Sequence, residues 1–337
     1  MDKTAVFKQY HDCIDQGMKV LVDQLSPGIR EIIYYHFGWE DGVEMSGSQG
    51  KKVRSILTLL VHEATTGDFN PAIPLAVAIE LTHNFTLILD DMEDRDLERR
   101  GRPTLWKKLG EGLAVNAGSL LYSLAFQSMN NLDIDRSKMA HMLSLFSQAS
   151  ISLAEGQHLD LMYENTAEIT QDMYFEVIGK KTATLLSYPT LMAATLATED
   201  EAIIEAFNQF GWNLGVAYQI RDDYLNIWGD AEVLGLKMYS DIRKKKKCLP
   251  VIYALETLSA EGRKQLQAIY SRNEGELDAA EVEQVLGLLE KSDAKANSVA
   301  TFKQYHGQAL QALSQVPREN HAMQFLAAMT HSLQVAE

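Results

Sequence analysis

The 337-residue sequence is 46% hydrophobic and 23% charged, an ordinary soluble composition, and its 31 basic against 46 acidic residues give a net charge of −15 at pH 7. Such an acidic chain argues against a nucleic-acid surface and a polybasic membrane patch. The two cysteines, Cys13 and Cys248, give neither zinc spacing nor a disulfide framework, as in a reducing cytoplasm. With no apolar signal-peptide core and no uninterrupted apolar run near the roughly 18 residues of a membrane span, we expect a soluble cytoplasmic protein.

Helical periodicity runs through almost every segment of the chain. Ser26-Pro27 reads as an N-cap with proline at the first helical position, and Asn70-Pro71 opens a later helix after an apolar stripe that begins at Lys51. Further helices are predicted at 113–132, expected to be buried on most sides, and at 137–163, 173–195, 278–289 and 298–313. Residues 198–201, Thr-Glu-Asp-Glu, have the capping-box pattern and open one more helix.

The sequence has no alternating strand pattern, no Ser/Gly linker, no low-complexity tract and no short-period repeat. Only seven prolines occur in 337 residues, as suits long helices. The sequence therefore predicts an all-α fold. We expect one domain spanning residues 1–337.

The first stretch with chemical character runs from 80 to 104, ELTHNFTLILDDMEDRDLERRGRPT. At helical spacing His83, Leu87, Asp90 and Asp94 form one stripe, with Asp91 beside it. Two carboxylates one turn apart repel each other unless a cation lies between them.

A cationic pair, Arg99 and Arg100, follows before Gly101 and Pro103 break the helix. Carboxylates for a hard divalent ion, with arginines within reach, make a diphosphate site. Taken alone, an acidic cluster at a helix end is more ordinary and can simply be solvated.

A second acidic segment strengthens the interpretation. Residues 215–226 read GVAYQIRDDYLN, and Gly215, Gln219, Asp222 and Asn226 share one helical stripe there. Two aspartate-bearing helices facing each other across a bundle would close a polynuclear metal site.

The set of motifs resembles the trans-isoprenyl diphosphate synthase (polyprenyl synthetase) family, over about Gly50 to Pro250, and most of all a geranylgeranyl diphosphate synthase. DDMEDRDLERRGRP resembles the first aspartate-rich motif and YQIRDDYLN the second. GKKVR, ELTH, GQHLDL, KTA and SDIRKKKKCLP match other family segments in the family's order.

Some positions depart from the family pattern. Asn226 stands where most members have Asp, although eukaryotic geranylgeranyl synthases are similar in carrying Asn there. Lys52 replaces the usual Arg and Ser55 the usual Pro. Counting back from Asp241 aligns Lys237 with the family's diphosphate-binding lysine, whereas counting forward from Asp222 aligns Leu236.

The resemblance implies a single large antiparallel helical bundle around a central cavity. It also implies a chain-elongating prenyltransferase that ionises an allylic diphosphate, condenses the cation with isopentenyl diphosphate and loses a proton. It implies Mg2+, three ions in number, bound by Asp90, Asp94 and Asp222, with Asp91 and Asp223 supporting. The predicted catalytic residues are these five aspartates together with Arg99 and Lys181. No conventional general base is evident, and the departing diphosphate is the family's expected proton acceptor.

The same resemblance divides the substrate-binding residues between two diphosphates. Arg99, Lys181 and Lys237 would hold the allylic diphosphate, with Thr182 and Gln219 nearby and Lys246 a candidate phosphate contact. Lys51, Arg54, His83 and Arg100 would form a metal-free cationic pocket for isopentenyl diphosphate. Each has a plainer interpretation when taken singly: Lys51 and Arg54 as surface charges, His83 as a hydrogen-bonded core residue, Lys181 with Lys180 and the run 244–247 as solvated lysines.

Product length is expected to depend on the residues one turn before Asp90. Phe85 lies five residues before it, and the small Thr86 four. A single aromatic there resembles synthases that stop at geranylgeranyl diphosphate, which favours a C20 product over a C15 or longer one.

Two rival functions are a terpene cyclase of the same fold, which needs no isopentenyl pocket, and a non-catalytic partner subunit, which would lack motif aspartates. A purely structural helical protein would leave both acidic segments unexplained. The family also implies a homodimer formed through a helical face.

Overall fold

The structure is a computed structural model that describes residues 3–39, 50–164, 166, 169–230, 238–271 and 275–335. Its chain divides into two compact units. Unit 1 comprises Met1–Leu145, Met192–Glu199 and Asn320–Met323, and unit 2 comprises Phe146–Leu191, Asp200–Glu319 and Gln324–Glu337. The expectation of one domain over residues 1–337 stays a prediction.

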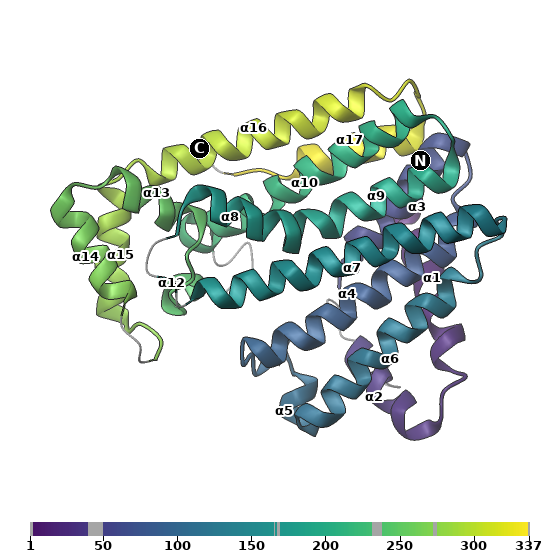
Figure 1. Ribbon diagram of the computed structural model, residues 1–337, viewed down its shortest axis with the longest axis horizontal. Helices are drawn as coiled ribbons and strands as arrows, with labels where there is room; N and C mark the ends of the chain where they lie inside the picture. The colour runs from purple at the N-terminus through teal and green to yellow at the C-terminus, as the bar shows by residue number, and fades with distance from the viewer. Residues whose placement is uncertain are drawn as a thin grey trace. The chain divides into compact units, whose positions relative to one another are not determined.

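Unit 1 holds the first acidic segment, and the regular structure of its described residues consists of helices (Figure 1) and one small hairpin. Its elements are α1 (Lys3–Val22), α2 (Pro27–Phe37), α3 (Val53–Thr66), the 3-10 turn η1 (Asn70–Ala72), α4 (Ile73–Glu93), β1 (Glu98–Arg99), β2 (Arg102–Pro103), α5 (Leu105–Leu109), α6 (Glu111–Met129) and the beginning of α7 (Arg136–Glu164).

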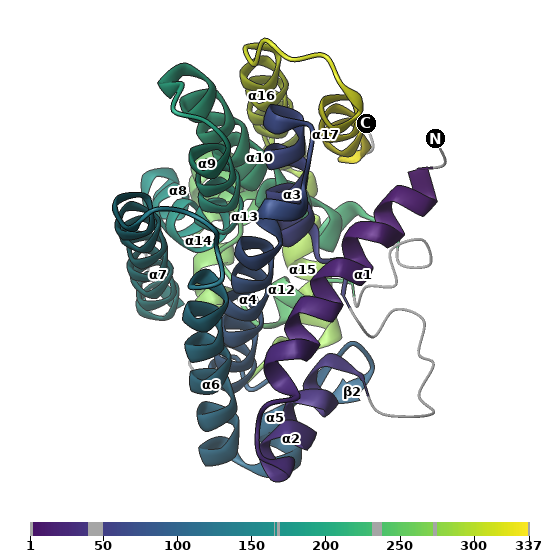
Figure 2. The same ribbon diagram turned by 90° about the vertical axis from the view of Figure 1, so that its right-hand side faces the viewer.

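Helix α4 is the core of unit 1, and α1, α3 and α6 pack against it (Figure 2). Its residues 75–82 are all buried, which explains why this stretch shows little amphipathic contrast. Residues Asn70–Glu93 form the one helix among those described that is long and apolar enough to cross a membrane, yet 61% of its apolar window is buried in the protein. That burial identifies α4 as the central helix of a packed unit.

Two expectations for unit 1 need correction. Helix α6 was expected to be buried on most sides, but one of its faces is open, and Leu113 and Val115 are 47% and 44% exposed. The helix of the first acidic segment ends at Glu93, well before Gly101, because the backbone at Arg95 turns into the left-handed region (φ 55°).

The residues after Arg95 form a two-residue hairpin that the sequence did not suggest. Glu98 pairs with Pro103 and Arg99 with Arg102 in an antiparallel ladder. The connecting residues, Arg100 and Gly101, both have positive φ (53° and 73°), as a two-residue turn of the primed type requires. Arg99 and Arg100 are therefore carried by a hairpin rather than by the helix.

Unit 2 holds the second acidic segment, and all regular secondary structure among its described residues is helical. Its elements are the rest of α7, α8 (Gln171–Ile178), the π-helix η2 (Gly179–Ala183), α9 (Thr184–Ala197), α10 (Glu201–Trp228), α12 (Ser240–Arg243), α13 (Leu249–Thr257), α14 (Ala260–Tyr270), α15 (Ala279–Glu290), α16 (Ala294–Ser314) and α17 (His321–Ser332), of which α9 and α17 belong partly to unit 1. Helices α10 and α16 run side by side along this unit (Figure 1).

The sequence-based boundaries were mostly right for unit 2, with two differences. The helix expected at 173–195 is three successive elements, because the π-helix η2 separates α8 from α9. Helix α10 is capped by Asp200, whose side chain accepts hydrogen bonds from the backbone N–H groups of Ala202 and Ile203, in place of the expected capping box from Thr198.

Candidate functional site

The first acidic segment places two aspartates one turn apart at the end of α4. The N–H of Asp94 donates to the carbonyl of Asp90 (2.8 Å), so helical geometry continues to Asp94 even though α4 ends at Glu93. Both residues are half-buried. The predicted stripe of hard oxygen donors is present in the structure.

Asp91 plays a different part from its two neighbours. It is 3% exposed, and its carboxylate accepts a hydrogen bond from Arg99 Nε at 2.6 Å. Burial raises the pKa of Asp91 to about 6, against the lowering effect of Arg99. The ion pair holds the β1–β2 hairpin against the end of α4, and the supporting role of Asp91 at a metal site stays a prediction.

A small cationic pocket of about 30 Å3, roughly the space of one water molecule, lies beside this ion pair. It is lined by Tyr35, His36, Asp91, Arg99, Arg100, Arg102, Pro103, Thr104 and Leu105. Tyr35 anchors the hairpin, since its hydroxyl donates to Pro103 O (2.8 Å) and its ring lies 4.0 Å from the Arg102 guanidinium.

His36 connects the cationic pocket to a buried polar network. Its Nε2 lies 3.1 Å from Asn84 Oδ1, and Asn84 donates to the carboxylate of Glu80, which also accepts from Ser55 Oγ. Burial, and then Arg100, lowers the pKa of His36 to about 4. His36 is therefore neutral at pH 7. The Ser55 hydroxyl donates a buried hydrogen bond to Glu80, which the proline usual at this position could not make.

Three residues of the predicted isopentenyl pocket lie in one part of unit 1. Arg54 Nη1 lies 3.1 Å from His83 Nε2. Burial, Arg54 and Arg100 hold the pKa of His83 well below its usual range. His83 Nδ1 is buried and has no hydrogen-bond partner among the described residues, so a ligand atom there would satisfy it. Lys51 is exposed on the turn before α3.

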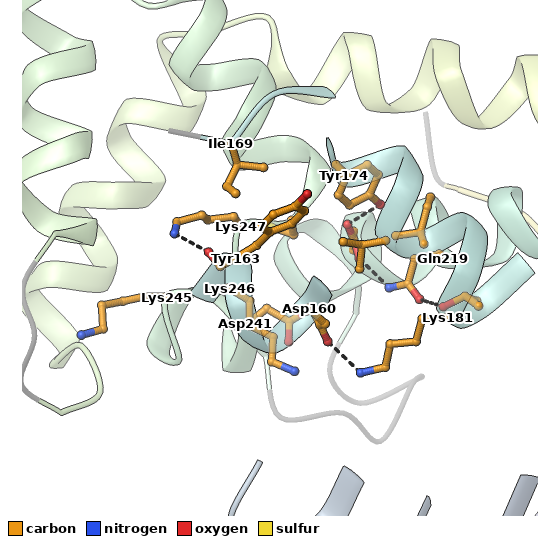
Figure 3. Close-up of a pocket in the computed structure, with 15 residues that line it drawn as sticks. Asp160, Tyr163, Ile169, Tyr174, Lys181, Gln219, Asp241, Lys245, Lys246 and Lys247 are labelled. Carbon is orange, nitrogen blue, oxygen red and sulfur yellow. Dashed lines mark hydrogen bonds and ion pairs between the residues drawn. The ribbon is translucent and has the colours of Figure 1, made fainter. Parts of the chain in front are cut away.

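Unit 2 contains a larger cavity of about 250 Å3 (Figure 3). Polar groups and apolar side chains both line it: Asp160, Tyr163, Ile169, Tyr174, Val177, Ile178, Lys181, Thr182, Gln219, Asp223, Asp241, Lys245, Lys246, Lys247 and Cys248. The predicted residues Lys181, Thr182, Gln219 and Lys246 thus meet in one place.

The π-helix η2 presents Lys181 and Thr182 to this cavity. It lies between two close backbone approaches, because a Cβ on Gly156 of α7 would lie 2.6 Å from Lys181 N and one on Gly215 of α10 would lie 2.5 Å from Ala183 Cα. Only glycine fits at those two positions. π-Helical turns occur often at functional sites.

Each cavity-facing side chain of η2 has a defined partner. Lys181 Nζ donates to Asp160 at 2.7 Å, and Thr182 Oγ1 donates to Gln219 Oε1 at 2.8 Å (Figure 3). Lys180, by contrast, pairs with the surface carboxylates of Glu155 (3.0 Å) and Glu176 (3.2 Å). The two adjacent lysines are therefore not one solvated pair.

The second acidic segment separates an open carboxylate from a buried one. The side chain of Asp222 is 43% exposed, whereas Asp223 is 4% exposed. Asp223 accepts hydrogen bonds from Tyr174 Oη (2.8 Å), Gln219 Nε2 (2.8 Å) and Leu249 N (2.9 Å). Burial, and then Asp241, raises the pKa of Asp223 to about 6. Asp223 thus ties together Tyr174, Gln219 and Leu249, and its predicted supporting role beside a metal ligand at Asp222 stays a prediction.

Asn226 holds the returning chain. Its Nδ2 donates to Ser240 Oγ (2.7 Å), its Oδ1 accepts from Asp241 N (3.2 Å), and its carbonyl accepts from Tyr239 N (2.9 Å). Asp223 and Asn226 therefore fix the two ends of the segment 239–249, which carries the lysines of the cavity.

The lysine run 244–247 was expected to be solvated, with only Lys246 near phosphate, and this is wrong for Lys247. Its Nζ donates to the carbonyls of Tyr163 (2.8 Å) and Thr166 at the C-terminal end of α7. Lys246 donates its backbone N–H to Asp241 O (2.8 Å). Lys237 lies outside the described residues, and its predicted contact is untested.

Sequence reasoning gave no role to Tyr174 and none to Asp160 or Asp241. Asp160 and Asp241 stand in GQHLDL and SDIRKKKK, so their motifs had singled them out without a function. Tyr174 carried no signal, because its link to Asp223 spans 49 positions.

The chemistry of the predicted metal ligands, taken unit by unit, is compatible with magnesium. No group of three or more His, Cys, Asp or Glu side chains converges on one point among the described residues. Mg2+ usually takes one or two carboxylates and completes its shell with water and substrate phosphates. The half-exposed carboxylates of Asp90, Asp94 and Asp222 suit that coordination.

Comparison with known proteins gives consistent matches. A family model described as Polyprenyl synthetase matches residues 43–289. The chain is 36% identical over 256 residues to a (2E,6E)-farnesyl diphosphate synthase of Mycobacterium tuberculosis, which covers 75% of this chain and 71% of that protein. It is also 36% identical over 257 residues to a geranylgeranyl diphosphate synthase of the same organism, with 76% and 73% covered.

Solved structures agree over nearly the whole chain. A geranylgeranyl pyrophosphate synthetase from Pyrococcus horikoshii superposes with a TM-score of 0.89 at 31% identity, covering 99% of this chain and 98% of that one. A polyprenyl synthase from Caulobacter crescentus, complexed with calcium and isoprenyl diphosphate, gives 0.83 at 25% identity, covering 97% and 94%. The predicted all-α fold is that of these enzymes.

Proposed function

Since this chain belongs to the polyprenyl synthetase family and is a prenyltransferase, as its motifs predicted, we propose that it condenses an allylic diphosphate with isopentenyl diphosphate and releases geranylgeranyl diphosphate. The relatives are named as farnesyl and as geranylgeranyl synthases, so the family alone leaves the chain length open. The C20 product is part of the proposal.

The observation that supports elongation best is the cationic group around His83. Arg54 lies 3.1 Å from one ring nitrogen of His83, and the other ring nitrogen is buried without a partner among the described residues. A buried, unsatisfied nitrogen beside arginine suits an anionic ligand. A cyclase that uses the allylic substrate alone has no need of this second anion site.

On the allylic side, Asp90, Asp94 and Asp222 would hold Mg2+, three ions in the full complex. When bound, Mg2+ offsets the negative charge that develops on the leaving diphosphate. Arg99 and Lys181 would hold the same diphosphate, and both are already oriented by carboxylates, Asp91 at 2.6 Å and Asp160 at 2.7 Å.

On the nucleophile side, Lys51, Arg54, His83 and Arg100 would hold isopentenyl diphosphate without metal. Neutral His83 can donate a hydrogen bond without adding charge to a region already rich in arginine. The released diphosphate would accept the proton lost after condensation.

Gln219, Thr182 and Lys246 line the cavity of unit 2 and would contact the allylic diphosphate.

The C20 proposal has support in how Phe85 is packed. Its ring lies 5.1 Å from the ring of Tyr122 on α6, and a Cβ on Gly118 would lie 3.3 Å from Phe85 Cδ2. The ring is thus held by α6 at the depth of one helical turn from Asp90. A ring packed in this way would obstruct a growing chain at a definite length.

The exposed apolar residues Leu113 and Val115 on α6 suit a helical face covered by a second copy of the chain, so we also propose a homodimer. We propose that it is located in the cytoplasm.

The decisive experiment for function is incubation of the purified protein and Mg2+ with labelled isopentenyl diphosphate and, in turn, dimethylallyl, geranyl or farnesyl diphosphate. An elongated C20 product supports the proposal. A hydrocarbon formed from the allylic substrate alone would identify a cyclase, and no product from any primer would indicate a partner subunit.

A further inference from the structure

The turn before α3 has an unusual backbone on both sides of Lys51. Gly50 has φ +69° and Lys52 has φ +44°, the left-handed region that a residue with a side chain seldom adopts. Such a turn persists only when its surroundings fix it, and turns of this kind concentrate at ligand sites. What fixes it here comes from α1, which lies outside the matched range 43–289.

Lys52 is anchored on α1 by its side chain. The side chain is only 1% exposed, and its Nζ lies 2.9 Å from Asp15 Oδ2 and 3.0 Å from His11 Nε2. His11 also approaches Asp15, at 3.2 Å, and the carbonyl of Gly50, at 3.4 Å. His11 and Asp15 therefore contact both residues that flank Lys51.

A buried lysine cannot remain charged without a partner, so Lys52 and Asp15 depend on each other. The left-handed backbone of the turn directs the Lys52 side chain towards α1, where Nζ meets Asp15. The α1 contacts thus oppose relaxation of the turn to an ordinary conformation.

The clamped turn adjoins the predicted isopentenyl pocket. A Cβ on Gly50 would lie 2.6 Å from Arg100 Nη2, so the turn and the Arg100 guanidinium are in close contact. Arg54 follows two residues after Lys52, in the first turn of α3, and reaches His83. A shift of the turn would therefore move Lys51 and Arg54 and disturb Arg100.

We propose that Asp15 and His11 of α1 are positioning residues for the isopentenyl diphosphate pocket and act through Lys52. This inference rests on the proposed function of Lys51, Arg54 and Arg100. It gives the N-terminal helix a part in substrate affinity that the family motifs do not contain.

The test compares Asp15→Asn with Asp12→Asn, the same substitution at an exposed position of the same helix. Asp15→Asn should raise the KM for isopentenyl diphosphate about tenfold and leave kcat and the KM for the allylic substrate within about twofold. Asp12→Asn should match wild type. Lys52→Met should behave like Asp15→Asn, and Lys52→Arg, which keeps the charge, should recover most of the affinity. An unchanged KM in Asp15→Asn, or an equal rise in both KM values, would overturn the proposal.

Amide hydrogen exchange of residues 50–57 provides a readout without catalysis. Asp15→Asn should speed exchange there while α6 keeps its wild-type protection, and unchanged exchange would also overturn the proposal. If the wild-type protein forms no elongated product, the proposed function fails. The exchange result still decides whether Asp15 and His11 hold the turn at residues 50–52. If Asp15→Asn folds poorly, His11→Ala takes its place, because it removes only the weaker contacts. His11→Ala is expected to raise the KM for isopentenyl diphosphate and to speed exchange at residues 50–57, both to a smaller degree. If His11→Ala changed neither quantity, the proposal would be overturned.

Discussion

The carboxylate of Asp223 accepts a hydrogen bond from the backbone N–H of Leu249, 26 positions further along the chain, at 2.9 Å. The same carboxylate also accepts hydrogen bonds from Tyr174 Oη and Gln219 Nε2. Its neighbour Asp222 has a side chain that is 43% exposed. Two adjacent aspartates of one motif therefore lie in different environments, and mutagenesis should separate their effects on stability and on activity.

Replacing the open carboxylates should remove activity without unfolding the protein. Asp90→Ala or Asp222→Ala is expected to lower kcat by at least about a hundredfold, because each variant would lose a proposed Mg2+ ligand. The free energy of unfolding, measured by urea denaturation, should change by less than about 1 kcal/mol, since neither side chain belongs to the core. A chelator should likewise stop turnover and leave the circular dichroism spectrum unchanged. Near-native activity of either variant in Mg2+ would refute the metal assignment.

Asp223 should behave in the opposite way. Asp223→Ala leaves three donors unpaired in a buried place, which is expected to cost roughly 3 kcal/mol of unfolding free energy. Activity should fall as well, because the segment 239–249 loses one of its two attachments. Urea denaturation beside Asp222→Ala provides the comparison. A variant as stable as wild type would mean that Asp223 does not hold this segment.

The sequence predicted the helices and the acidic stripes because both depend on residues within one or two turns of each other. Asp90 and Asp94 could be paired from spacing alone. The partners of the buried aspartates could not, since Arg99 returns through a hairpin and Tyr174 lies 49 positions before Asp223. Only tertiary packing decides which aspartate of a pair is buried.

Backbone irregularities also escaped prediction. Residues 173–195 carry an unbroken helical pattern, and nothing local marks the π-helix at Gly179–Ala183, whose close packing against Gly156 and Gly215 involves two distant segments. The left-handed turn at Lys52 depends in the same way on Asp15, 37 positions earlier. The family motifs contain Lys52, Gly156 and Lys181 but do not indicate the backbone geometry at these positions.

The pH dependence of stability should reveal His36. Its pKa is lowered to about 4 in the folded protein, below the ordinary 6.5 of the unfolded chain. Between these values the unfolded state binds more protons, so the stabilising effect is fully present above pH 6.5 and is lost as pH falls towards 4. His36→Gln keeps a donor for Asn84 but cannot titrate, and should lose roughly 2 kcal/mol less than wild type between pH 7 and 4.5. Urea titrations at both pH values check this, and parallel losses in the two proteins would show that His36 is not the group concerned.

Binding at the two proposed diphosphate sites should depend on different cationic residues. Arg54→Ala or Lys51→Ala is expected to raise mainly the KM for isopentenyl diphosphate, because these cations would serve the nucleophile. Arg99→Ala should act on the allylic substrate and on kcat, and it also leaves Asp91 without its 2.6 Å partner. Steady-state kinetics with each substrate varied in turn will separate the effects. Equal effects of all three variants on both substrates would contradict the division.

The length of the product should depend on the ring of Phe85. That ring packs against Gly118 and lies 5.1 Å from Tyr122, which in turn lies 5.1 Å from Phe126. Phe85→Ala removes the first ring and should lengthen the main product by at least one isoprene unit, with Mg2+ dependence unchanged. Tyr122 remains as the next ring of the series, so the double variant with Tyr122→Ala should extend the product further. Thr86→Ala is the matched control, because the Thr86 hydroxyl donates to the carbonyl of His83 within its own helix and its loss should leave the product at C20. Chromatography of the dephosphorylated products measures all three variants, and an unaltered product from Phe85→Ala would mean that the chain is stopped at another position.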